Sequence, residues 1–261
     1  MFNRDRNQPQ RYEAPKPVAD RPGYPWASAG AGRGAGEAAA EPGMLVAREG
    51  FLTASFVWMF LALLASTASA GFVIANSATV LPLLGRWFLP LILVELGLVF
   101  AISLGINRLG AIPALALLFA YALLNGVTLS VVVYVYTAES ILSAFLGAAA
   151  IFGGAALYGV VTKRDLTSLG GILVMGVVGL IVVSLVNVFL LPSTQLSWII
   201  GIAGVVIFTG LTAYDVQRIN NGNLGWIKTR EGASVVGALA LYLDFVNLFL
   251  MLLRVFGSSR D

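Results

Sequence analysis

The sequence predicts an all-α polytopic membrane protein with seven transmembrane helices, and three observations lead to this fold class. First, 58% of the 261 residues are hydrophobic and only 11% are charged, whereas about a quarter of the residues in soluble domains are charged. Second, the first fifty positions hold 13 of the 29 charged residues, which leaves 16 for the remaining 211. Third, the apolar runs are continuous rather than alternating, which favours helices over a membrane β-barrel.

The first fifty residues are expected to form a disordered cytoplasmic tail. They contain Pro, Gly, Ala and both signs of charge, but almost no aliphatic side chains. Such a segment cannot bury enough apolar area to offset the entropy of ordering it. The transmembrane domain is therefore expected to cover residues 51–257, and residues 258–261 are expected to form a short C-terminal tail.

Seven apolar runs follow the tail, each close to the ~20 residues that a helix needs to cross the hydrocarbon core. Their predicted ranges are 51–74, 87–106, 112–136, 141–161, 169–191, 197–219 and 233–256. Pro113 fits the first turn of the third run, and Pro192 follows the end of the fifth. Glycines such as Gly201 and Gly204 are expected to let helices approach closely.

The basic residues predict an orientation. Cytoplasmic connections of membrane proteins are enriched in Lys and Arg. With the tail inside, the outer side holds two basic residues and the inner connections hold six, namely Arg108, Lys163, Arg164, Arg218, Lys228 and Arg230. We therefore expect a cytoplasmic N-terminus and, because the number of spans is odd, a C-terminus on the opposite face.

The chain contains no cysteine and no histidine. Disulfides, Cys/His zinc sites, thiol nucleophiles and imidazole bases are therefore excluded. The remaining chemistry relies on carboxylates, amides, hydroxyls and a few cations. We expect no cofactor, no nucleic-acid partner and no enzymatic activity.

Four ionisable residues lie inside the predicted spans: Glu95, Asp215, Asp244 and Arg254. Each costs about 2.5 to 3.5 kcal/mol on insertion scales, so each is a candidate functional residue. The second run descends from the outer side, which places Glu95 at a depth where Arg254 can reach it. The two are therefore expected to neutralise each other as a buried pair, with either a bracing or a functional role.

Asp215 and Asp244 are both expected in the cytoplasmic half of neighbouring helices, at about 1.5 Å per residue from the inner face. Two facing carboxylates share a proton more readily than both ionise. Hard cations such as calcium bind oxygen ligands with negative charge. The pair is therefore a candidate proton and calcium site. For Asp215, a simple interfacial contact with Arg218 is the alternative.

The seventh run has one polar face. At 100° per residue, Asp244, Asn247 and Arg254 fall within a sector of about 80°. A helix that is otherwise apolar is expected in the middle of a bundle, with this face toward a cavity. Asn125 and Asn187 are candidates to line the same cavity together with Asn247, although hydrogen bonding between helices is their commoner role.

Two segments resemble the signature stretches of the Bax inhibitor family, also called the transmembrane Bax inhibitor motif group: TAYDVQRI at 212–219 and ALALYLDFVNLFLMLLRVFG at 238–257. LLNGVTLS at 123–130 and the acidic residue of the second run are also similar to family segments. The resemblance implies six helices surrounding a central C-terminal helix in a bacterial inner membrane. It also implies a pH-sensitive calcium leak controlled by Asp215 and Asp244, with Glu95 and Arg254 as the supporting pair.

The resemblance further implies a latch, in which an arginine from the inner end of the second helix contacts the aspartate of the sixth. The nearest candidate is Arg108, slightly further along than the family pattern expects. Two other functions stay open. The chain is alternatively an interaction protein that modulates a membrane protease or another membrane partner, or a proton-coupled cation exchanger. An intramembrane aspartyl protease is not expected, because its GxGD pattern is absent.

Overall fold

The computed structural model describes residues 42–224, 227 and 229–258. Seven helices account for nearly all of them: α2 (Pro42–Ala75), α3 (Ser77–Leu109), α4 (Ala111–Val135), α5 (Ala138–Val161), α6 (Thr167–Phe189), α7 (Thr194–Asn220) and α8 (Arg230–Phe256). Each of the seven is long and apolar enough to cross a membrane. The predicted all-α fold with seven transmembrane helices is confirmed.

The first helix begins earlier than predicted. α2 starts at Pro42, so it includes residues 42–50, which the sequence analysis assigned to the tail. Proline is favoured in the first turn of a helix because its missing N–H would have no partner there. The apolar run MLVA follows, and Arg48, Glu49 and Gly50 separate it from the span that begins at Phe51. The rest of the predicted tail, residues 1–41, lies outside the described residues, as do residues 259–261.

The second span is longer than predicted. α3 begins at Ser77 instead of residue 87 and contains Pro82 and Pro90. The sequence analysis placed residues 77–86 outside the span, yet apart from Pro82 and Arg86 they are mostly apolar. At about 1.5 Å per residue, Glu95 lies about 27 Å from Ser77, near the middle of the helix.

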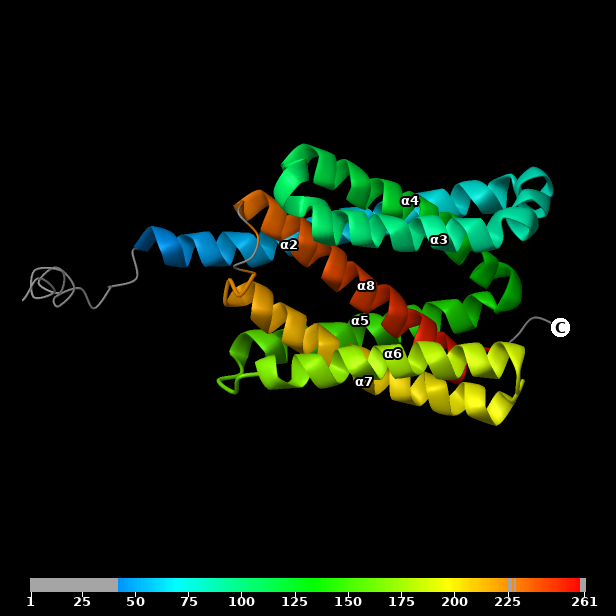
Figure 1. Ribbon diagram of the computed structural model, residues 1–261. Coiled ribbons are helices and arrows are strands. Elements are labelled where there is room, and N and C mark those ends of the chain that lie inside the picture. The colour runs from blue at the N-terminus through cyan, green and yellow to red at the C-terminus, as the bar shows by residue number, and fades with distance from the viewer. Residues whose placement is uncertain (1–41, 225–226, 228, 259–261) are drawn as a thin grey trace, which may run out of the picture. The chain divides into compact units, whose positions relative to one another are not determined.

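The C-terminal helix forms the centre of the bundle (Figure 1). α8 crosses between α2, α3 and α4 on one side and α5, α6 and α7 on the other, and it packs against α3, α4, α5 and α7. In its most apolar segment 67% of the residues are buried, compared with 11% to 39% in the other six helices. The prediction of a central C-terminal helix is therefore confirmed.

Glycines bring α7 and α8 close together. A Cβ atom added at Gly201 would lie 2.6 Å from Cγ2 of Val255, and one added at Gly204 would lie 2.5 Å from Cγ of Met251. Both distances are too short for a real Cβ contact, so a larger residue at either position would force Val255 or Met251 to move. The close contact between the two helices places the polar residues of α7 beside α8.

Candidate ion site and buried polar network

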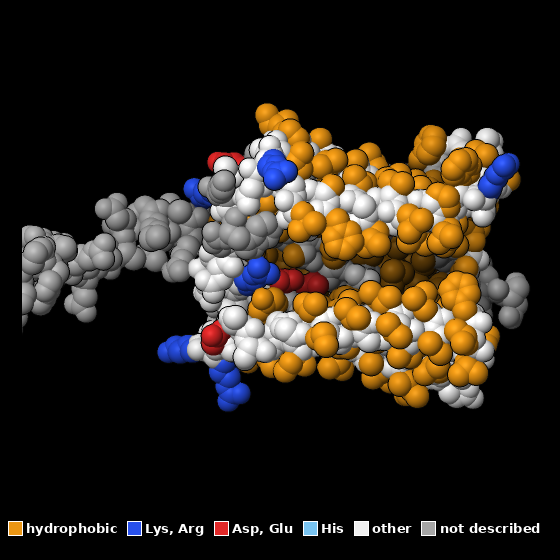
Figure 2. All heavy atoms as spheres, in the orientation of Figure 1, with side chains coloured by type: hydrophobic (Ala, Val, Ile, Leu, Met, Phe, Trp, Pro, Cys, Tyr) orange, Lys and Arg blue, Asp and Glu red, His pale blue; other side chains and the backbone are white. Residues whose placement is uncertain are grey.

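The two aspartates of the predicted pair come together at the interface of α7 and α8. Asp244 lies midway along α8 and only 4% of its surface is exposed. Asp215 lies in the last third of α7 and is half-buried. The two carboxyl groups are close enough to interact electrostatically. Figure 2 shows acidic side chains in a hollow between the two groups of helices, beside a basic side chain.

One oxygen of Asp244 has no hydrogen-bond partner. Oδ2 is buried, and no donor among the described residues reaches it. Nearly all buried polar atoms in native proteins are hydrogen-bonded, so an exception marks an atom with a role other than packing. Asp244 therefore offers a free, buried carboxylate oxygen beside a second carboxyl group.

Asp215 also has a basic neighbour. Arg218 follows three residues later on α7, the spacing at which helical side chains meet, and it interacts electrostatically with Asp215. Nε of Arg218 donates to the carbonyl oxygen of Asn223 at 3.4 Å, and Cζ lies 6.0 Å from the centre of the Tyr214 ring. Asp215 thus interacts electrostatically both with Asp244 and with Arg218, the two neighbours that the sequence analysis considered as alternatives.

Arg108 does not contact Asp215. It is exposed in the last turn of α3, and α3 packs against α4 and α8 rather than against α7. Ile106, near the same end of α3, lies against Gly232 at the start of α8. The predicted latch by Arg108 is therefore not formed in this structure, and Arg218 is the arginine that interacts with Asp215.

Glu95 belongs to a different site. Its side chain is buried, and both of its carboxylate oxygens accept hydrogen bonds from α4. Nδ2 of Asn125 donates to Oε2 at 3.2 Å, and the hydroxyl of Thr128 donates to Oε1. The prediction of a direct Glu95–Arg254 pair is wrong, because the partners of Glu95 are neutral side chains.

The bonds of Glu95 continue into a network that joins four helices. The hydroxyl of Tyr242, on α8, donates to Oδ1 of Asn125 at 2.9 Å and lies 2.7 Å from Oγ of Ser66 on α2. Ser66 also lies 2.7 Å from the carbonyl oxygen of Ala122 on α4. We call Ser66, Glu95, Asn125, Thr128 and Tyr242 the buried polar network.

Arg254 instead binds three neutral groups of α6 and α7. Nε donates to Oγ of Ser197 at 2.7 Å, and the Nη atoms lie 3.4 Å from Ser184 Oγ and Asn187 Oδ1. At about 1.5 Å per residue, Arg254 lies about 18 Å along α8 from Tyr242, which contacts the buried polar network. Arg254 and Glu95 therefore lie at different depths in the bundle. The sequence analysis placed Glu95 closer to the outer end because it began the second span at residue 87, whereas α3 begins at Ser77.

The three candidate cavity residues have separate roles. Asn125 is a member of the buried polar network. Nδ2 of Asn187 donates to the carbonyl oxygens of Leu191 and Ser193, at 3.2 and 3.0 Å, and so ties the α6–α7 connection. Nδ2 of Asn247 donates to the carbonyl oxygen of Leu243 on its own helix at 2.8 Å. Asn125 and Asn187 thus form the hydrogen bonds between helices and connections that the sequence analysis named as their alternative role.

The sequence analysis missed Tyr242 and Ser66. Tyr242 lies two positions before Asp244 and is completely buried, but a tyrosine in an apolar run is usually a packing residue. Its ring packs edge-on against Tyr121, with centroids 5.6 Å apart. The signal that the sequence offered for Tyr242 was the general rule that a buried tyrosine hydroxyl needs a hydrogen-bond partner.

The site has few ligands for a metal ion. Among the described residues, no group of three or more Asp and Glu side chains is arranged to hold a metal. Calcium takes six to eight oxygen ligands, so the Asp215–Asp244 pair would supply part of a coordination shell.

The sequence is similar to known proteins over most of its length. The model of a family described as "Inhibitor of apoptosis-promoting Bax1" matches residues 48–261. The chain belongs to the Bax inhibitor family. It is an integral membrane protein, and seven helices within its described residues are long and apolar enough to cross the membrane.

Bacterial relatives share this similarity. The "Inner membrane protein YbhL" of Escherichia coli is 45% identical over 219 residues, which are 80% of this chain and 92% of that protein. An uncharacterized protein of Deinococcus radiodurans is 41% identical over 213 residues, covering 81% of this chain and 91% of the relative. One of Borreliella burgdorferi is 46% identical over 177 residues, covering 67% and 76%.

Proposed function

We propose that this member of the Bax inhibitor family is a pH-sensitive leak channel for calcium ions, gated by the Asp215–Asp244 pair. The observation that carries the proposal is the unpartnered Oδ2 of Asp244, buried beside the carboxyl group of Asp215. We place the channel in a bacterial inner membrane, because the relative from Escherichia coli is named an inner membrane protein. The proposed activity is transport without catalysis and without a cofactor.

The proposed mechanism follows from the charge of the pair. Two neighbouring carboxylates repel when both are ionised, and either a shared proton or a bound cation relieves the repulsion. Calcium is the proposed cation because it is hard and prefers carboxylate oxygens. Only two carboxylates are present, so binding is weak and transient, which suits conduction better than storage. Acid weakens calcium binding because protonation removes the negative charge.

Arg218 is the proposed competitor for calcium at Asp215. It interacts with Asp215 in the structure, and its bond to Asn223 and its contact with Tyr214 hold it at the end of α7. When Asp215 is ionised, Arg218 neutralises it and competes with the ion. Protonation of Asp215 removes its negative charge, so Asp215 then attracts neither Arg218 nor calcium.

The test is calcium flux into liposomes that contain only this protein, measured between pH 5 and pH 8. Asp215→Asn and Asp244→Asn are each expected to remove most of the pH response, and the double variant is expected to add little because the pair titrates as a unit. Asp165→Asn, which changes an exposed aspartate in the α5–α6 connection, is the matched control and should respond as the wild type does.

Three outcomes would contradict the proposal. An intact pH response in the double variant would show that another group senses the proton. Flux that requires an opposing proton gradient would identify a proton-coupled exchanger. Absence of flux from the purified protein would favour an interaction protein that acts on a membrane protease or another membrane partner.

A further inference from the structure

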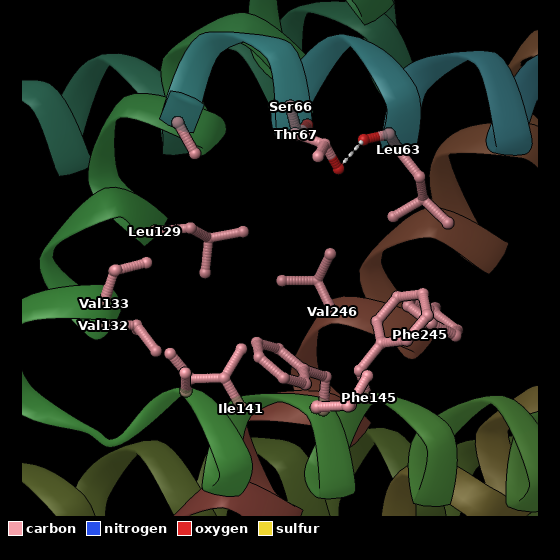
Figure 3. Close-up of a pocket in the computed structure, with 14 residues that line it drawn as sticks. Leu63, Ser66, Thr67, Leu129, Val132, Val133, Ile141, Phe145, Phe245 and Val246 are labelled. Atoms are coloured by element: carbon pink, nitrogen blue, oxygen red, sulfur yellow. Dashed lines mark hydrogen bonds between the residues drawn. The ribbon is translucent and has the colours of Figure 1, made fainter. Parts of the chain in front are cut away.

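An apolar cavity of about 500 Å³ lies between α2, α4, α5 and α8 (Figure 3). Fourteen residues line it, and only Ser66 and Thr67 among them have polar side chains. Leucine, valine and phenylalanine side chains from the four helices point into the space, among them Leu129, Phe145 and Val246. No charged residue contributes to the wall.

Both hydroxyl groups of the wall are already hydrogen-bonded to the protein. Ser66 Oγ lies 2.7 Å from the carbonyl oxygen of Ala122 and 2.7 Å from the hydroxyl of Tyr242. Thr67 Oγ1 donates to the carbonyl oxygen of Leu63 at 2.9 Å, the bond drawn in Figure 3. A buried water needs two to four polar partners. The cavity therefore does not suit water or a polar ligand.

The cavity lies at the depth of the lipid hydrocarbon. Its α2 wall runs from Leu63 to Ala70, within the span Phe51–Ala75. It is not enclosed, and the medium around a transmembrane span at this depth is acyl chain. Its volume lies in the range of about 300 to 1,000 Å³ that is usual for ligand sites. A helix of about 10 Å diameter would fill it with roughly one turn, so a partner helix does not fit.

We propose that this cavity binds one acyl chain of a membrane phospholipid. The acyl chain of a phospholipid already lies in hydrocarbon, so removal of apolar surface from water contributes nothing to its binding. Binding instead comes from van der Waals contacts with apolar side chains of four helices that surround the acyl chain. The inference needs only the placement of the protein in a membrane and is independent of the proposed calcium leak.

The proposal is tested with the full chain in nanodiscs that contain a phospholipid with a photoactivatable diazirine in its acyl chain. After illumination, labelled peptides are mapped by mass spectrometry. We expect labelling of the cavity segments 63–70, 141–145 and 245–249 to exceed that of the exposed faces of α3 and α6. Equal labelling of all these surfaces would overturn the proposal.

A filled cavity provides the matched comparison. Ala70→Phe adds a ring to the cavity wall, whereas Ala68→Phe adds the same ring to an exposed position of α2 that does not line it. We expect Ala70→Phe to reduce labelling of segments 141–145 and 245–249 several-fold and Ala68→Phe to leave it unchanged. Equal labelling in the two variants would contradict the site.

A second pair of variants keeps the test valid if Ala70→Phe does not fold. Ala138→Phe fills the same cavity from the first turn of α5, and Ala149→Phe is its exposed control on the same helix. The same reduction is expected for Ala138→Phe alone. Labelling of the cavity by a diazirine-bearing free fatty acid, but not by the phospholipid, would also overturn the proposal.

Discussion

Two buried polar regions contact α8, and they differ in how fully their polar atoms are hydrogen-bonded. In the buried polar network, Glu95 accepts bonds with both oxygens, and Tyr242 connects Asn125 to Ser66. At the interface with α7, Asp244 keeps an oxygen that no described donor reaches, and its charged neighbour is another carboxyl group. Glu95 and Asp244 are both buried, so burial alone does not explain the difference.

The difference separates a structural role from a functional one. A satisfied polar network inside a membrane protein holds its helices in one arrangement, and removal of one member leaves its partners without bonds. An unsatisfied carboxylate stabilises nothing by itself and is available to a proton or a cation. We therefore expect substitutions in the buried polar network to change stability, and substitutions of Asp244 to change flux.

The largest effect is expected from Glu95→Ala. This change leaves the buried amide of Asn125 without its acceptor, at about 1 to 3 kcal/mol, whereas the hydroxyl of Thr128 keeps the carbonyl oxygen of Leu124, 3.2 Å away, as an acceptor. The free energy of unfolding in mixed micelles, measured by titration with a denaturing detergent, should fall accordingly. Glu95→Gln keeps one carbonyl acceptor and should lose less. Equal losses in the two variants would show that the hydrogen bonds of Glu95 do not stabilise the bundle.

A smaller change in the opposite direction is expected from Asp244→Asn. No hydrogen bond to the buried oxygen is lost, and the electrostatic interaction with Asp215 is removed. The unfolding free energy at pH 7 is therefore expected to stay unchanged or to rise by about 1 kcal/mol, as is common when a functional site is neutralised. A loss comparable to that of Glu95→Ala would remove the distinction between the two regions.

Little coupling is expected between Glu95 and Arg254. Their hydrogen-bond partners are different, and they lie at different depths. Losses in unfolding free energy at independent sites add to within about 0.3 to 0.5 kcal/mol. A double-mutant cycle with Glu95→Gln and Arg254→Gln should therefore show additivity. A coupling energy above about 1 kcal/mol would restore the direct pair that the sequence suggested.

The smallest effect is expected from Asp165→Asn. Hydrogen bonds from the hydroxyl and the N–H of Thr167 hold the pKa of this exposed carboxyl group below its ordinary value of 3.8. A group with a lowered pKa contributes stability above its unfolded pKa and loses it as the pH falls through the folded pKa. Melting curves of the variant and the wild type should therefore run parallel from pH 5 to pH 8. Divergence within this window would show that the α5–α6 connection senses pH.

The sequence determined the number and type of the helices. Long continuous apolar runs cannot remain in water, and in a bilayer their backbone must form helices, so the seven spans and the central α8 followed from composition and from the polar face at Asp244. The aspartate pair was also predictable, because both residues interrupt apolar runs at similar depths. The start of α3 was not predictable, because Pro82 and Arg86 resemble a connection although the helix continues through them.

The tertiary structure decided which polar groups meet. A helical sequence determines which side chains share a face and how far apart they lie along the axis, but not the depth at which two helices pack. The early start of α3 placed Glu95 beside Asn125 and away from Arg254, and the packing of α3 against α4 and α8 kept Arg108 from Asp215. A shift of a few turns along an apolar helix changes its hydrophobic pattern little, but it gives every polar side chain a different partner. Only the packing of the helices determines which of these arrangements forms.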